Sequence, residues 1–97
     1  MRLEFHPEAR LELYESAAFY KEVRPSLGIA FTNEIESILH QILEAPDRCP
    51  FIEEDVRRCF ARRFPYGVLC TIETDSILIL AIMHCSRKPG YWRKRLL

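Results

Sequence analysis

The chain of 97 residues lacks the signatures of several large classes of protein. Its longest apolar run, Ile77 to Met83, is far too short to span a bilayer. The residues from Met1 to Pro7 contain no apolar signal-peptide core, so we expect a cytoplasmic protein that does not contact a membrane. There is no His-Glu-x-x-His, P-loop or Gly-x-Ser-x-Gly motif. We therefore expect no metal and no cofactor, and the length allows a single domain over residues 1–97.

Closely spaced cysteine pairs are also missing. Cys49, Cys59, Cys70 and Cys85 are spaced by 10, 11 and 15 positions, and no Cys-x-x-Cys pair suits a zinc ribbon or a thioredoxin-type site. An even number of cysteines is compatible with two disulfides. Because reduced thiols are the norm in the cytosol, we predict free, mostly structural thiols.

The charges balance to zero but are divided unevenly along the chain. Residues 1–55 hold 12 Asp and Glu against 5 Lys and Arg, whereas residues 56–97 hold 9 Lys and Arg against 2 Asp and Glu. The basic half indicates either an anionic partner or neutralisation by the acidic half across the fold.

Hydrophobic spacing predicts one strand followed by a helical hairpin. Leu3 and Phe5 alternate with polar residues, as in a short half-buried strand, and Pro7 suits the first turn of a helix. Helical spacing then covers residues 9–23 and 27–45, with a short break between them. The first helix has two neighbouring apolar stripes: Leu11, Tyr14 and Ala18, and Leu13, Ala17 and Tyr20.

Three strands are predicted after a loop that runs from Pro46 to about Asp55. They cover residues 56–63, 68–73 and 77–83, with a turn at residues 65–67 between the first two and a tight hairpin at residues 74–76 before the last. The last strand is continuously apolar, so it should lie in the centre of the sheet. The predicted fold class is α+β, in the order β-α-α-β-β-β, with the helical hairpin packed on a small, mostly antiparallel sheet.

Chemically capable side chains gather after the last predicted strand and before Pro65. His84 directly follows the strand, and histidine is a residue type suited to proton transfer, although a histidine that merely caps the strand is an equal alternative. Arg62 and Arg63 precede Pro65, where guanidinium groups suit phosphate or simply protect a sheet edge.

The C-terminal residues interleave aromatic and basic side chains. Tyr91 and Trp92 lie among Lys88, Arg93 and other basic residues, a pattern that suits stacking on single-stranded RNA. The alternative for Trp92 is that it folds back onto the sheet, because tryptophan is usually largely buried. The acidic run of residues 53–55 offers a general base or is a solvated loop.

The opening strand and helix, the helical hairpin and two segments together resemble a known superfamily over nearly the whole chain. The segments are Arg-Arg-Phe-Pro-Tyr at residues 62–66 and Ile-Met-His-Cys-Ser-Arg-Lys-Pro-Gly-Tyr-Trp at residues 82–92. They resemble the RelE/ParE superfamily of bacterial type II toxin–antitoxin toxins, the plasmid stabilisation proteins. The resemblance implies a growth-arresting toxin that is either a metal-independent mRNA endoribonuclease, commonly at the ribosome, or a DNA gyrase inhibitor. A degenerate, non-toxic antitoxin-binding module is the alternative.

The resemblance also implies roles for individual residues. In RelE-like nucleases the RNA 2′-hydroxyl attacks the neighbouring phosphate, assisted by a base, an acid and arginines. By position, the implied catalytic residues are Arg63, His84, Arg87 and Tyr91, with a weaker match for Glu54. From the pattern of basic and aromatic residues, the expected contacts to RNA or another target are Arg58, Arg62, Lys88, Trp92 and Arg93. The ending His-x-x-Arg-Lys-Pro-x-x-Trp looks closer to the ParE-like branch.

A partner follows from the same resemblance. It implies an antitoxin protein that is encoded next to the toxin and forms a hetero-oligomer with it. An acidic segment of that antitoxin would cover the basic half of the chain.

Overall fold

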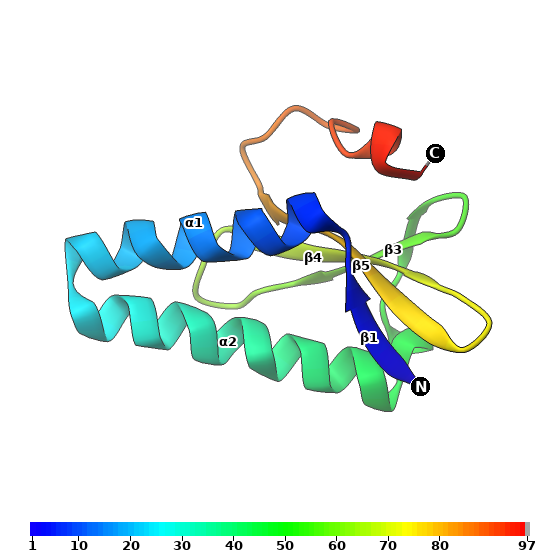
Figure 1. Cartoon of the computed structure of the whole chain (residues 1–97), viewed down its shortest axis with the longest axis horizontal. Coiled ribbons are helices and arrows are strands. Elements are labelled where there is room, and N and C mark those ends of the chain that lie inside the picture. The colour runs from blue at the N-terminus through cyan, green and yellow to red at the C-terminus, as the bar shows by residue number, and fades with distance from the viewer. Residues whose placement is uncertain (97) are drawn as a thin grey trace.

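A helical hairpin and a five-stranded sheet make up the computed structural model, which describes residues 1–96 (Figure 1). In chain order the elements are β1 (Arg2–Phe5), α1 (Pro7–Val23), α2 (Pro25–Glu44), the 3-10 helix η1 (Pro46–Arg48), β2 (Phe51–Glu53), β3 (Val56–Phe60), β4 (Tyr66–Ile72), β5 (Ser76–His84) and the 3-10 helix η2 (Arg93–Leu96). The α+β class and the helical hairpin are confirmed. Within the described residues, no helix is both long and apolar enough to cross a membrane.

The two long helices are separated by a single residue, Arg24, and each begins with a proline, which suits the first position of a helix. Pro7 stands at the start of α1, where the His6 ring caps the helix by accepting a hydrogen bond from the Glu8 amide at 3.1 Å. Close approach of the helices requires Gly28, since a Cβ atom there would lie 2.9 Å from Lys21 Cβ. The hairpin extends past the sheet at one end (Figure 1).

Only one of the two predicted stripes of α1 faces the core. Leu13, Ala17 and Tyr20 pack against the sheet and α2. Leu11 and Tyr14, which belong to the other stripe, are instead 49% and 61% exposed. An apolar stripe along a helix shows which residues share a face but not which face a neighbouring element covers.

The strands are arranged in the order β1-β5-β4-β3-β2, in which β1 runs parallel to β5 and the remaining pairs are antiparallel. The mostly antiparallel sheet is confirmed. The strand predicted to be central, β5, is an interior strand between β1 and β4, and β4 is the middle strand. The predicted loop at residues 46–55 is wrong in part because it contains η1 and β2. The strand predicted over residues 56–63 ends at Phe60, and β4 already begins at Tyr66, inside the predicted turn.

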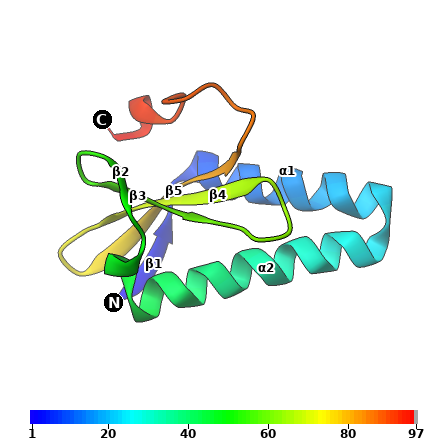
Figure 2. The same ribbon diagram turned by 180° about the vertical axis from the view of Figure 1, so that it is seen from behind.

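Each face of the sheet has its own apolar cluster. On the helical side, Phe31 and Ile35 of α2 pack against Val68 and Ile79. On the other side, Leu69, Leu80, Met83 and neighbouring residues are covered by Trp92. The covering segment, residues 85–96, is called the tail below; it crosses the sheet on the side away from α2 (Figures 1 and 2).

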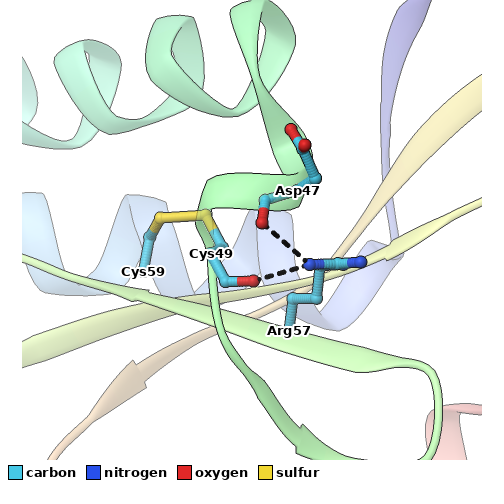
Figure 3. The surroundings of a disulfide bond; sticks show 4 residues. All are labelled: Asp47, Cys49, Arg57 and Cys59. Atoms are coloured by element: carbon cyan, nitrogen blue, oxygen red, sulfur yellow. Dashed lines mark hydrogen bonds between the residues drawn. A yellow bond between two sulfur atoms is a disulfide. The ribbon is translucent and has the colours of Figure 1, made fainter.

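A disulfide joins Cys49 to Cys59, so the prediction of free thiols is wrong for this pair (Figure 3). Cys49 follows η1 and Cys59 lies in β3, ten positions later, yet their Cα atoms are 5.3 Å apart. The chain that leaves α2 turns back across β3, and this path brings the two side chains together. Cys70, which is buried, and Cys85, which is exposed, are free as predicted.

Candidate functional site

The tail is fixed to the rest of the fold by one acidic residue of α1. The Glu12 carboxylate accepts hydrogen bonds from Tyr91 Oη at 2.6 Å and from Arg95 Nη1 and Nη2 at 2.9 and 2.8 Å. Its side chain is 12% exposed and that of Arg95 is 7% exposed. Burial raises the pKa of Glu12, but the hydrogen bonds from Arg95, Tyr91 and the Ile82 amide outweigh burial and hold the pKa below its usual value.

The same carboxylate and Arg95 satisfy backbone groups where β5 is irregular. The register between β4 and β5 shifts next to Leu69. At this irregularity two consecutive residues of β5, Leu80 and Ala81, both belong to the apolar cluster under the tail. The Ile82 amide donates to Glu12 Oε1 at 3.0 Å, and the Leu80 carbonyl accepts from Arg95 Nη1 at 3.0 Å. The irregularity of β5 and the position of the tail are therefore linked through one ion pair.

Tyr91, a predicted catalytic residue, is enclosed by charged groups. The guanidinium carbons of Arg87 and Arg95 lie 3.8 and 5.0 Å from the centre of its ring. Burial, followed by the hydrogen bond to Glu12, raises the pKa of Tyr91 well above its usual value. The phenol is thus held as a neutral hydrogen-bond donor to an internal partner, which suits a structural role better than proton transfer.

A basic hollow of about 400 Å³ lies between the tail and β3, on the side of the sheet away from α2. Three arginines line it: Arg58 from β3, and Arg87 and Arg93 from the tail. The Arg58 side chain crosses Gly67, where a Cβ atom would lie 3.1 Å from Arg58 Cδ. Trp92 also borders the basic hollow but is 3% exposed, so it packs on the sheet, as the second interpretation of this residue predicted.

One wall of the basic hollow is neutralised by an internal carboxylate. Arg93 donates from Nε and Nη2 to the two Glu53 oxygens at 2.7 and 2.8 Å. This paired geometry is the one that guanidinium and carboxylate groups favour. Arg87 is half exposed, and its nearest acid is Glu12 at 3.9 Å. The basic hollow therefore offers Arg58 and Arg87 to an external anion more readily than Arg93.

Arg62 and Arg63 lie in a different hollow, beside α2. The Glu34 carboxylate accepts from both of their backbone amides and from Arg63 Nε, the last two at 2.9 and 3.1 Å. Burial opposes ionisation of Glu34, but these hydrogen bonds prevail and lower its pKa. Glu34 thus fixes the turn between β3 and β4, and the Arg63 guanidinium already has an acidic partner within the protein.

His84 ends β5 at the same end of the sheet as Arg62 and Arg63. The register pairs His84 with Tyr66, and their rings lie 5.0 Å apart in an edge-on arrangement. The His84 Nδ1 atom accepts from the Ser86 amide at 3.0 Å. This nitrogen is used in the turn that follows β5, as expected of a residue that caps a strand.

Glu54 lies in the turn between β2 and β3, where it has a positive φ of 42°. It lines a hollow with Glu53, Asp55 and Arg95 rather than the one that contains Arg87. The five predicted catalytic residues therefore line no common cavity among the described residues. Of the predicted contact residues, the structure gathers Arg58, Arg93 and Trp92 around Arg87; exposed Lys88 follows Arg87 in the tail.

Sequence reasoning missed the two glutamates that organise these groups. Glu12 and Glu34 are each one of several glutamates in an amphipathic helix, and nothing local distinguishes them from exposed neighbours such as Glu15 and Glu36. The sequence offers one indirect indication of their role. Glu12 and Glu34 each lie in a helical turn that also carries residues of the core-facing stripe. Their partners lie 79 and 29 positions away, at Tyr91 and Arg63.

Comparison with known proteins finds a matching family model and a solved structure with a similar fold. The model of the family described as "ParE toxin of type II toxin-antitoxin system, parDE" matches residues 3–89. No curated protein sequence matches the chain. A solved structure described as "Chromosomal ParDE TA system from P. aeruginosa" is similar with a TM-score of 0.75 and 18% sequence identity; the alignment covers 87% of this chain and 95% of the other.

Proposed function

Since the chain belongs to the ParE toxin family of type II toxin–antitoxin systems, we propose that it arrests growth by binding DNA gyrase in the cytoplasm and not by cutting RNA. The observation that carries this proposal is the contact between Tyr91 and Glu12. A general acid or base works best when its pKa is near the operating pH. The pKa of Tyr91 is moved away from neutrality, and its hydroxyl is occupied by a carboxylate with little exposure.

The other candidate groups of a nuclease support the same view. Arg63 is paired with Glu34, and Glu54 faces a hollow that does not contain Arg87. Transition-state stabilisation requires donors aimed together at one developing charge. A binding inhibitor requires only a surface of suitable shape and charge.

We place the gyrase contact on the basic hollow and on Lys88 beside it. Arg58 and Arg87 lie on separate elements but open into the same space, and Lys88 is exposed. Such a surface attracts an acidic patch on a protein partner. An acidic segment of the antitoxin, bound at the same place, would neutralise the toxin by competing with gyrase.

The proposal is tested by a gyrase supercoiling assay on the purified protein, with RNA cleavage by the same sample measured in parallel, with and without ribosomes. We expect inhibition of supercoiling and intact RNA. Replacing Arg58 and Lys88 by glutamine should raise the concentration required for inhibition about tenfold, which corresponds to about 1.4 kcal/mol of binding free energy. The matched control replaces Arg2 and Arg10, which lie on β1 and α1, by glutamine and should leave inhibition unchanged.

Two outcomes would overturn the proposal. RNA cleavage without an effect on gyrase would restore the nuclease interpretation, and His84→Ala should then abolish the cleavage. A folded protein that binds its antitoxin but affects neither RNA nor gyrase would instead be a degenerate antitoxin-binding module.

A further inference from the structure

The Cys49–Cys59 disulfide closes a loop that contains the whole of β2. Cys49 is 1% exposed, whereas Cys59 is half-buried in β3 and contacts the core on the helical side. Figure 3 shows the bond joining the segment that follows α2 to β3. A covalent link at this point restricts how far β2 can move from the sheet.

The noncovalent contacts of this loop are modest. β2 has three residues at the edge of the sheet, and its register with β3 shifts between Phe51 and Glu53. The Arg57 guanidinium donates to the carbonyls of Asp47 and Cys49 at 3.2 and 2.9 Å (Figure 3). It also lies 3.8 Å from the centre of the ring of Phe51, a residue that is 57% exposed. Short edge segments with few buried contacts are the first to open.

The position of β2 also determines part of the basic hollow. Glu53, the last residue of β2, holds Arg93 of the tail through two hydrogen bonds at 2.7 and 2.8 Å. Both residues line the basic hollow, together with Ile52 of the same strand. Opening of β2 would therefore remove one wall and release Arg93.

We propose that Cys49 and Cys59 form a thiol–disulfide exchange site whose redox state controls the order of β2 and of the basic hollow. The inference rests on the proposed action on gyrase, which places the protein among intracellular thiols. Disulfides in that environment are usually transient and redox-sensing rather than permanent. The partner that this site takes is a dithiol reductant, small or protein-borne.

Exchange begins at Cys59, because it is the more exposed of the two cysteines. A thiolate of the reductant attacks Cys59 Sγ and forms a mixed disulfide, while Cys49 leaves as a thiolate and takes up a proton. The second thiolate of the reductant attacks the reductant's sulfur in the mixed disulfide. Cys59 is then released and protonated, and the reductant becomes a disulfide. Two electrons and two protons have passed to the protein.

The remaining cysteines provide controls. Burial raises the pKa of the Cys70 thiol to about 11, so it reacts slowly with other thiols. Cys85 is exposed and borders the basic hollow, where it has no part in the loop that contains β2. Cys85→Ser therefore tests whether an effect of reductant arises from the tail instead of from Cys49 and Cys59.

Hydrogen exchange of the full-length protein, measured by mass spectrometry in oxidised glutathione and in dithiothreitol, tests the proposal. We expect at least tenfold faster exchange of amides 51–58 in dithiothreitol, faster exchange of amides 90–96, and unchanged exchange in α1 and α2. The double variant Cys49→Ser/Cys59→Ser should exchange like the reduced protein in both buffers, and Cys85→Ser should behave like the wild type.

Alkylation followed by mass measurement reports the state of each thiol in the same samples. Two outcomes overturn the proposal: free Cys49 and Cys59 in oxidised glutathione, or identical exchange of amides 51–58 when the pair is oxidised and reduced. These readouts do not involve gyrase. A redox-dependent exchange pattern in a protein that fails to inhibit gyrase would support this inference and refute the proposed function alone.

Discussion

Replacing Glu12 by glutamine removes the negative charge that neutralises Arg95 beneath the tail. The two side chains are 12% and 7% exposed, so the arginine would keep its charge in a site with little access to water. Glutamine has nearly the same shape and can still accept one hydrogen bond. The variant therefore tests the charge of Glu12 with little change in packing.

The expected cost follows from the burial of the pair. Removing one partner of a buried ion pair costs about 3–5 kcal/mol. Because glutamine can still accept a hydrogen bond, we expect Glu12→Gln to cost about 3 kcal/mol, at the lower end of this range. For a domain of this size that corresponds to a fall in Tm of about 12–24 °C. A loss of this size is a large part of a typical stability of about 5–15 kcal/mol.

Urea unfolding monitored by circular dichroism and by tryptophan fluorescence provides the assay. Trp92 is the only tryptophan and is buried under the tail, so its emission should shift to longer wavelength when the tail detaches. Glu15→Gln, at an exposed position of the same helix, is the control and should change the free energy of unfolding little. A cost below about 1 kcal/mol for Glu12→Gln, with unshifted emission, would refute the assigned role of this ion pair.

Three further predictions concern stability. Because the pKa of Glu12 is lower in the folded state, its contribution to the free energy of unfolding is present above about pH 4.3 and is lost as the pH falls through the folded pKa. The free energy of unfolding should therefore fall less steeply with decreasing pH for Glu12→Gln than for the wild type. Glu34→Gln should cost about 2 kcal/mol and speed amide exchange at residues 62 and 63, whereas equal exchange in both proteins would contradict the assigned role of Glu34. Cys49→Ser/Cys59→Ser should lower the free energy of unfolding by about 3 kcal/mol relative to the oxidised wild type, and equal urea midpoints would argue against a stabilising disulfide.

The sequence predicts those elements whose signal is local and repeated. The helices follow from apolar residues at helical spacing and, for the first, from Pro7, and the interior position of β5 follows from its continuous apolar run. β2 was missed because three residues, with Phe51 exposed, are too few to show alternation. The parallel pairing of β1 with β5 joins segments more than 70 positions apart, which no local pattern reveals.

The sequence indicates which types of residue form the candidate site better than it indicates how those residues are arranged in space. Arg58 and Arg87 do share a hollow, but Tyr91 and Arg63 are each engaged by a glutamate from a helix. These engagements depend on how the hairpin and the tail pack against the sheet. The disulfide was missed for a similar reason, since the path of the chain between α2 and β3 brings Cys49 to Cys59.

Induction of the toxin in cells that lack its antitoxin tests the central claim most directly. Chromosome breaks, replication and translation would be followed together over the first minutes after induction. We predict gyrase-linked DNA breaks and arrested replication while transcripts stay intact and translation continues. Cut mRNA and collapsed translation on an intact chromosome would contradict the assignment of a gyrase-binding toxin.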